Sequence, residues 1–67
     1  MFKFILIKDE NIYSETTNIL DFDNEITTII YDNNLLSLEK IKVTSLISLI
    51  LLIVNELDFD IIIKKED

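Results

Sequence analysis

The stretch from Thr44 to Leu57 reads T-S-L-I-S-L-I-L-L-I-V-N-E-L and is the most hydrophobic part of the chain. On a helix, Ser45, Ser48 and Asn55 share one narrow side, and Leu, Ile and Val take almost every other direction. A helix with so narrow a polar stripe has to be covered on most of its circumference. The stretch therefore predicts a helix over 45–57 that lies in a core, in a buried interface or in a membrane.

The length of this stretch and the charge of the chain both disfavour a membrane. Only thirteen residues between Lys42 and Glu56 carry no charge, whereas a helix needs about twenty apolar residues to span a bilayer. The apolar run that begins at Phe4 is also too short for the core of a signal peptide. The net charge of −7 opposes binding to anionic headgroups. We therefore expect a cytoplasmic protein without membrane association.

The size of the chain limits what it can build. Its 67 residues allow a single domain over 1–67, and a core of that size is marginal unless packing or oligomerisation supplements it. The chain has no cysteine and no histidine, so disulfide bonds, the commonest metal ligand and the usual general base are all missing. A hydrophobic content of 49% still predicts a folded domain. We expect no enzyme, no metal and no cofactor.

The thirteen acidic residues outnumber the six lysines and are unevenly spread. Eight of them lie between Asp9 and Glu39, where there is no lysine. Direct binding to nucleic acid is disfavoured, because such binding depends on Lys and Arg replacing counterions on phosphates. A basic protein surface is the natural partner for this half of the chain. The alternative is that these acids only keep an apolar protein soluble.

Short runs rich in Ile, Thr and aromatic residues predict strands around the apolar helix. We expect these strands at 2–8, 12–20, 25–32, 35–43 and 59–65, with a weak helical face as the alternative over 12–20. Asp21–Asn24 is interpreted as a turn, and Asn33-Asn34 as a two-residue hairpin turn, because Asn tolerates positive φ. Thr44 or Ser45 is the expected N-cap of the helix.

These elements predict an α+β fold. It is a small antiparallel β-meander made of the first four strands, with one apolar helix over 45–57 packed on it and a last strand over 59–65. The chain contains no Gly, Pro, Ala or Arg, which is typical of an extremely AT-rich coding sequence and enriches Ile throughout.

Two groups of residues are candidates for binding a partner. Asp21, Asp23, Glu25 and Asp32 have the spacing of a calcium loop, but Ile26 stands where that loop requires Gly, so we expect no metal there. We expect these four acids instead to bind a basic surface of a partner protein. Ile47 and Ile50 of the apolar helix form the second group, which another chain would cover.

A second interpretation concerns Ser45. The pair Ser45-Leu46, followed fourteen residues later by Phe59-Asp60 and then by Ile63, resembles the middle of acyl carrier proteins and related phosphopantetheine-binding domains. Leu51 and Leu52 match core positions of the helix in that family. The resemblance covers the second half of the chain, about 34–67, and implies that Ser45 carries a 4′-phosphopantetheine arm. The residues themselves allow a simpler role for Ser45, as a helix cap.

Two functions are therefore expected from the sequence. The first is a small acidic, non-enzymatic protein that binds another protein, either as an inhibitor of a basic, nucleic-acid-binding surface or as a minor subunit of a larger assembly. Homodimerisation is compatible with both forms. The alternative function is an acyl-carrier-like protein modified on Ser45.

Overall fold

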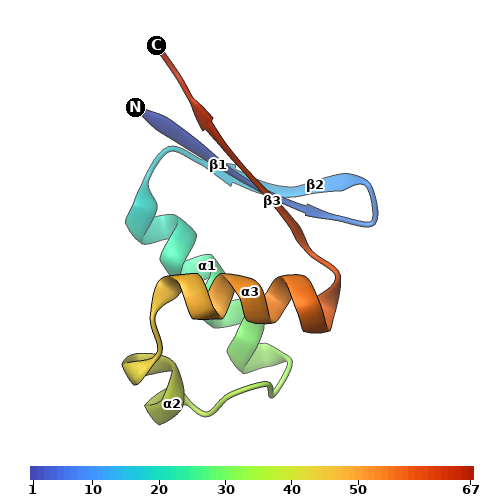
Figure 1. Ribbon diagram of the computed structural model, residues 1–67, viewed down its shortest axis with the longest axis vertical. Coiled ribbons are helices and arrows are strands. Elements are labelled where there is room, and N and C mark those ends of the chain that lie inside the picture. The colour runs from blue at the N-terminus through green and yellow to red at the C-terminus, as the bar shows by residue number, and fades with distance from the viewer.

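A three-stranded antiparallel sheet and three helices make up the fold, in a computed structural model that describes residues 1–67 (Figure 1). In chain order the elements are β1 (Phe2–Lys8), β2 (Asn11–Thr16), α1 (Ile19–Asp32), α2 (Leu38–Val43), α3 (Leu46–Leu57) and β3 (Asp60–Lys65). The strand order is β2-β1-β3, so the first strand of the sequence is the central one. All three helices lie on one face of the sheet and leave the other face uncovered (Figure 1). The predicted α+β class is confirmed.

The strand predicted at 2–8 is present as β1, and its alternation decides which side chains meet the helices. Phe4 stacks on Phe22 of α1 with 4.8 Å between ring centroids, and Leu6 is completely buried. Ile5 and Ile7 therefore lie on the uncovered face. The strand predicted at 59–65 is also present, as β3 over Asp60–Lys65.

A tight hairpin joins β1 to β2. Lys8 pairs with Asn11, which leaves Asp9 and Glu10 as a two-residue loop with φ of 53° and 65°. Positive φ at both positions defines a type I′ turn, for which Asn-Gly is the usual sequence. Because the chain has no glycine, two acidic residues take this conformation instead. β2 ends at Thr16, so the strand predicted over 12–20 is correct only in its first part.

The strand predicted over 25–32 and the turn predicted over Asp21–Asn24 are both wrong, because these residues belong to helix α1. The Asn18 side chain caps the helix by accepting from the backbone N–H groups of Leu20 and Asp21. The buried residues of α1 have the spacing of a helical face, and they are Phe22, Ile26, Ile29 and Ile30. Burial of this stripe outweighs the preference of Ile and Thr for strands.

The hairpin predicted at Asn33-Asn34 and the strand predicted over 35–43 are also wrong. Asn33 is the C-cap of α1 and Asn34 has φ of 56°, so the tolerance of Asn for positive φ is used to end a helix. The Ser37 side chain then accepts from the backbone N–H of Lys40 and caps α2. α2 contributes one buried residue, Ile41, to the core.

Helix α3 matches the prediction over 45–57, and its N-cap is Ser45. Its burial differs from the expectation. Only Leu49 and Ile53 are buried, while Ile47 is 72% exposed and Leu51 is 56% exposed. The outer side of this apolar helix is therefore not covered by its own chain. The core is a single cluster of nine residues between the sheet and the helices: Leu6, Phe22, Ile26, Ile29, Ile30, Ile41, Leu49, Ile53 and Phe59.

Candidate functional site

The four acids predicted to bind a partner do not form one group. Asp21, Glu25 and Asp32 are four and seven residues apart on α1, so they lie along one flank of the helix. Asp23 lies on the other flank, where it lines a hollow of about 370 Å³ together with Lys42 of α2. A regular helix cannot wrap these carboxylates around one ion as a calcium loop does.

A larger hollow, of about 460 Å³, lies beside the first flank of α1. Five segments of the chain contribute to it: β1, β2, α1, the end of α3 and the residue before β3. Its lining residues are Lys8, Tyr13, Asn24, Glu25, Thr28, Ile29, Asp32, Asn33, Leu57 and Phe59. Two of the predicted acids, Glu25 and Asp32, thus belong to one concave site.

The aromatic wall of this hollow is fixed by local contacts. The β1–β2 register shifts between Leu6 and Ile7, which leaves Tyr13 as an extra residue on β2. The Tyr13 ring meets the buried Phe59 ring edge to face, with 5.2 Å between centroids. A bulge in the sheet therefore directs an aromatic side chain towards the hollow.

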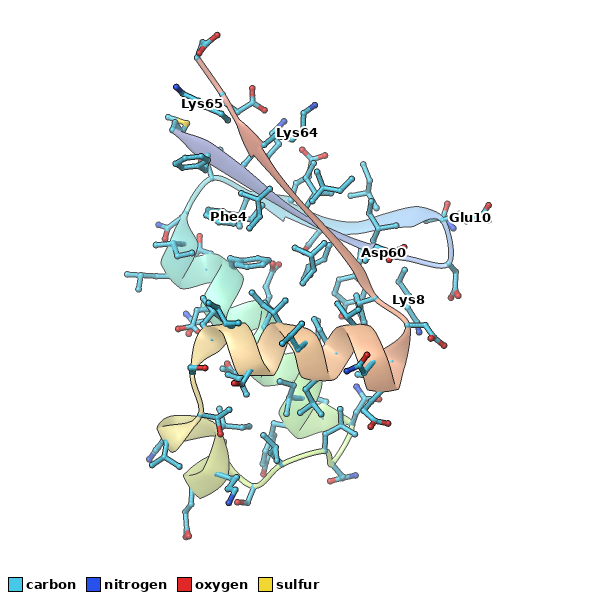
Figure 2. The ribbon with its side chains drawn as sticks, in the orientation of Figure 1. Phe4, Lys8, Glu10, Asp60, Lys64 and Lys65 are labelled. Carbon is cyan, nitrogen blue, oxygen red and sulfur yellow. The ribbon has the colours of Figure 1, made fainter.

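Lys8 is held at the same place by two interactions. Its ammonium group donates a hydrogen bond to the backbone carbonyl of Leu57 at the end of α3, and it lies 5.4 Å from the centre of the Phe59 ring. A cation near the last carbonyls of a helix is favourable because those carbonyls carry partial negative charge. Lys8 is therefore engaged by the protein itself (Figure 2).

The two carboxylates of the hollow differ in their contacts. Glu25 accepts a hydrogen bond of 2.9 Å from the hydroxyl of Ser14 on β2, which fixes its position. Asp32 has no hydrogen-bond or ion-pair partner and is exposed at the C-terminal end of α1. A carboxylate at this end of a helix is repelled by the dipole, so a cation beside Asp32 would relieve an unfavourable interaction. The site can accept a positively charged group.

The predicted apolar group is partly available. Ile47 projects into solvent, whereas Ile50 is half-buried and packs against the core. Ile47 lies one helical turn from the exposed Leu51, and Val43 at the end of α2 is 81% exposed. The structure thus places an apolar stripe on α3, separate from the acids of α1.

Ser45 has the geometry of a cap. Its hydroxyl accepts from the backbone N–H of Ser48 and donates to the Ser48 hydroxyl at 3.0 Å. Its side chain is exposed at the start of α3. Capping is confirmed, and modification by 4′-phosphopantetheine stays a prediction.

Sequence reasoning did not identify Lys8, Tyr13 or Phe59 as site residues. They come from the end of β1, a bulge in β2 and the residue before β3, so no local pattern joins them. Only the fold brings them beside Glu25 and Asp32.

Comparisons with protein families, characterised proteins and solved structures found nothing that matches this chain. None of its helices combines the length and the hydrophobicity that crossing a bilayer requires.

Proposed function

We propose that this chain is a small non-enzymatic protein that binds another protein by receiving a basic side chain of the partner in the hollow beside α1. The observation that carries the proposal is the composition of that hollow. Aromatic and aliphatic walls from Tyr13, Phe59, Leu57 and Ile29 lie next to the carboxylates of Glu25 and Asp32.

Each part of an arginine or lysine side chain finds a counterpart in this site. The apolar walls suit the methylene stem, and a carboxylate at the rim suits the charged end. The volume of about 460 Å³ falls within the range of about 300–1,000 Å³ that is typical of ligand-binding pockets. One side chain fills only part of the hollow, and the backbone of the partner would close the rest.

Long-range electrostatics supports the same partner. The net charge of −7 attracts a basic surface and accelerates encounter with it. Asp21 extends the acidic flank of α1 beyond the hollow, towards the start of the helix. A protein whose basic surface normally binds nucleic acid fits this description, and occupation of that surface would inhibit it.

A titration with matched peptides tests the proposal. A short peptide with a single arginine should cause saturable amide shifts in the chain at Tyr13, Thr28 and Asp32, at millimolar concentration. The same peptide with neutral citrulline should not cause them. Asp32→Asn should weaken binding at least about fivefold, which corresponds to about 1 kcal/mol for one charge-assisted contact.

The control for that variant is Glu39→Gln, which removes one negative charge from the exposed start of α2. It should leave the affinity for the arginine peptide within about twofold of the original. Equal loss in the two variants, or equal shifts with the citrulline peptide, would show general attraction to an acidic chain and reject the site.

A second function is kept because of one observation, the exposed position of Ser45 at the start of α3. Under this proposal the chain is a carrier that holds acyl groups on a 4′-phosphopantetheine arm. Treatment with coenzyme A and a phosphopantetheinyl transferase should add the arm to the original chain and not to Ser45→Ala. An unchanged intact mass of the folded original chain would reject the carrier function.

A further inference from the structure

β3 is an edge strand of the sheet, and one of its edges is free. β1 is the only strand that pairs with β3, and five of the six β3 residues are exposed. In Figure 1, β3 passes in front of β1, and no helix or loop lies in front of it. An edge of this kind presents unpaired N–H and C=O groups that another strand can bind.

The register of the sheet identifies which groups point outwards. The backbone N–H of Glu66 donates to the carbonyl of Met1, and Ile62 lies opposite Ile5 in the same ladder. Hydrogen-bonded pairs alternate along an antiparallel ladder, so the even-numbered residues of β3 direct their backbone groups towards β1. Ile61 and Ile63 therefore direct theirs towards the free edge.

The two edges of the sheet differ in regularity. β2 contains the bulge at Tyr13, which breaks the ladder and twists that edge. β3 has no such irregularity, because successive residues from Asp60 to Lys65 pair with successive residues from Ile7 to Phe2. Only the β3 edge offers a further strand a ladder without a bulge.

We propose that two copies of this chain pair through their β3 strands, antiparallel and about a two-fold axis at Ile62, to form one six-stranded sheet. In this register Ile62 lies opposite Ile62 of the second copy. Ile61 lies opposite Ile63, and the outward backbone groups of these two residues form four hydrogen bonds between the copies. Such an interface is isologous, as in most homodimers.

The charges of β3 favour this register. The sequence D-I-I-I-K from Asp60 to Lys64 is complementary to itself when reversed, so Asp60 lies opposite Lys64 of the second copy at both ends of the interface. Both side chains lie on the uncovered face of the sheet, next to the edge (Figure 2). They form a non-hydrogen-bonded pair, in which opposite side chains come closest.

Other registers lose this complementarity. A shift by one residue would place each residue of one copy opposite a residue whose side chain points to the other face of the sheet. A two-fold axis perpendicular to the sheet forbids this, because it keeps each face of the two copies on the same side. A shift by two residues in one direction places Asp60 opposite Glu66, two like charges. The opposite shift places Lys64 opposite Asp58, which lies outside the strand and has a left-handed φ of 56°. The register about Ile62 is therefore the one that the charges select.

Both charged residues are free to form the pair. The two ion pairs of the structure join Lys3 to Glu15 and Lys3 to Glu66, and neither uses Asp60 or Lys64. The inference is independent of the proposed function, because the hollow beside α1 contains no residue of β3. The opposing interpretation is that Lys64 guards the edge against pairing, as lysines often do.

Charge reversal separates the two interpretations. Sedimentation equilibrium should show a monomer–dimer equilibrium for the original chain. Asp60→Lys and Lys64→Asp should each weaken dimerisation at least tenfold, since each places like charges opposite one another twice. A mixture of the two variants should form a heterodimer, because every introduced charge then meets its opposite. The double variant Asp60→Lys with Lys64→Asp should dimerise alone.

Two further measurements make the test decisive. Lys65→Glu changes an exposed charge of the same strand on the other face, and it should leave the dimer intact. Amide exchange at Ile61 and Ile63 should slow with increasing protein concentration. A chain that stays monomeric at millimolar concentration, or single variants whose mixture does not associate, would overturn the proposal. Circular dichroism of each variant confirms that these surface substitutions leave the fold intact.

Discussion

The turn at Asp9-Glu10 offers a substitution that should stabilise the protein. Both residues have positive φ, and Glu10, with φ of 65°, is the less suited to it because its side chain lacks the local hydrogen bonds of Asp and Asn. The left-handed conformation costs an L-residue about 1–2 kcal/mol. Glycine avoids that cost but loses about 0.5–1 kcal/mol more conformational entropy on folding. Glu10→Gly should therefore increase the free energy of unfolding by about 0.5–1 kcal/mol.

Urea denaturation followed by circular dichroism measures this difference. With a slope of about 1 kcal/mol per molar for a small domain, the midpoint should rise by about 0.5–1 M urea. Glu10→Ala is the matched control, because it removes the same charge but keeps the Cβ atom that strains the turn. It should leave the midpoint almost unchanged. An equal rise in both variants would show that the charge matters and not the backbone, and a fall with glycine would refute the turn geometry.

Four other substitutions test the fold. Phe22→Leu should lower the free energy of unfolding by about 1–2 kcal/mol, because its stacking on Phe4 is lost. Phe2→Leu, at a position 53% exposed, should lower it by less than about 0.5 kcal/mol. Equal losses of the two variants in urea denaturation would contradict the assigned core. Asn18→Ala should cost about 1 kcal/mol by removing the cap of α1, measured in the same way. Hydrogen bonding to Glu15, and the charges of Glu15 and Glu66, raise the pKa of Lys3 above its ordinary value. The stabilisation that the charged Lys3 gives to the folded state is therefore complete below about pH 10.4, and it is lost as the pH rises through the raised pKa. The melting temperature should consequently fall more steeply above about pH 10 in the original chain than in Lys3→Met.

The elements that were predicted correctly are those in which the hydrophobic pattern and the secondary-structure propensity of the residues indicate the same structure. β1 and β3 are short runs of aromatic and β-branched residues, and they are strands. α3 combines an apolar run with Ser45 as a cap, and it is a helix. Where propensity and periodicity point to the same structure, neither has to be weighed against the other.

The wrong predictions concern segments in which strand propensity and helical spacing disagree. The run E-I-T-T-I-I-Y-D has strand propensity, but Ile26, Ile29 and Ile30 continue the helical spacing that begins at Phe22. The spacing was visible in the sequence, as was Asn18 at the position of a cap. An Ile-rich composition raises strand propensity everywhere, so periodicity is the better guide in such a chain. The hollow beside α1 was beyond prediction, because its walls come from residues far apart in the sequence.

The central position of β1 has a consequence for the order in which the protein folds. Its hairpin with β2 closes over two residues, whereas Ile7 meets Asp60 fifty-three positions later in the sequence. Hairpins form in about 1–10 μs, and the entropy of closing a long loop must be overcome before distant contacts compensate it. We expect the hairpin and the α1–α3 pair to form early and β3 to dock last, as the rate-limiting step. The strand that offers the free edge is therefore also the one that leaves first when the native state opens.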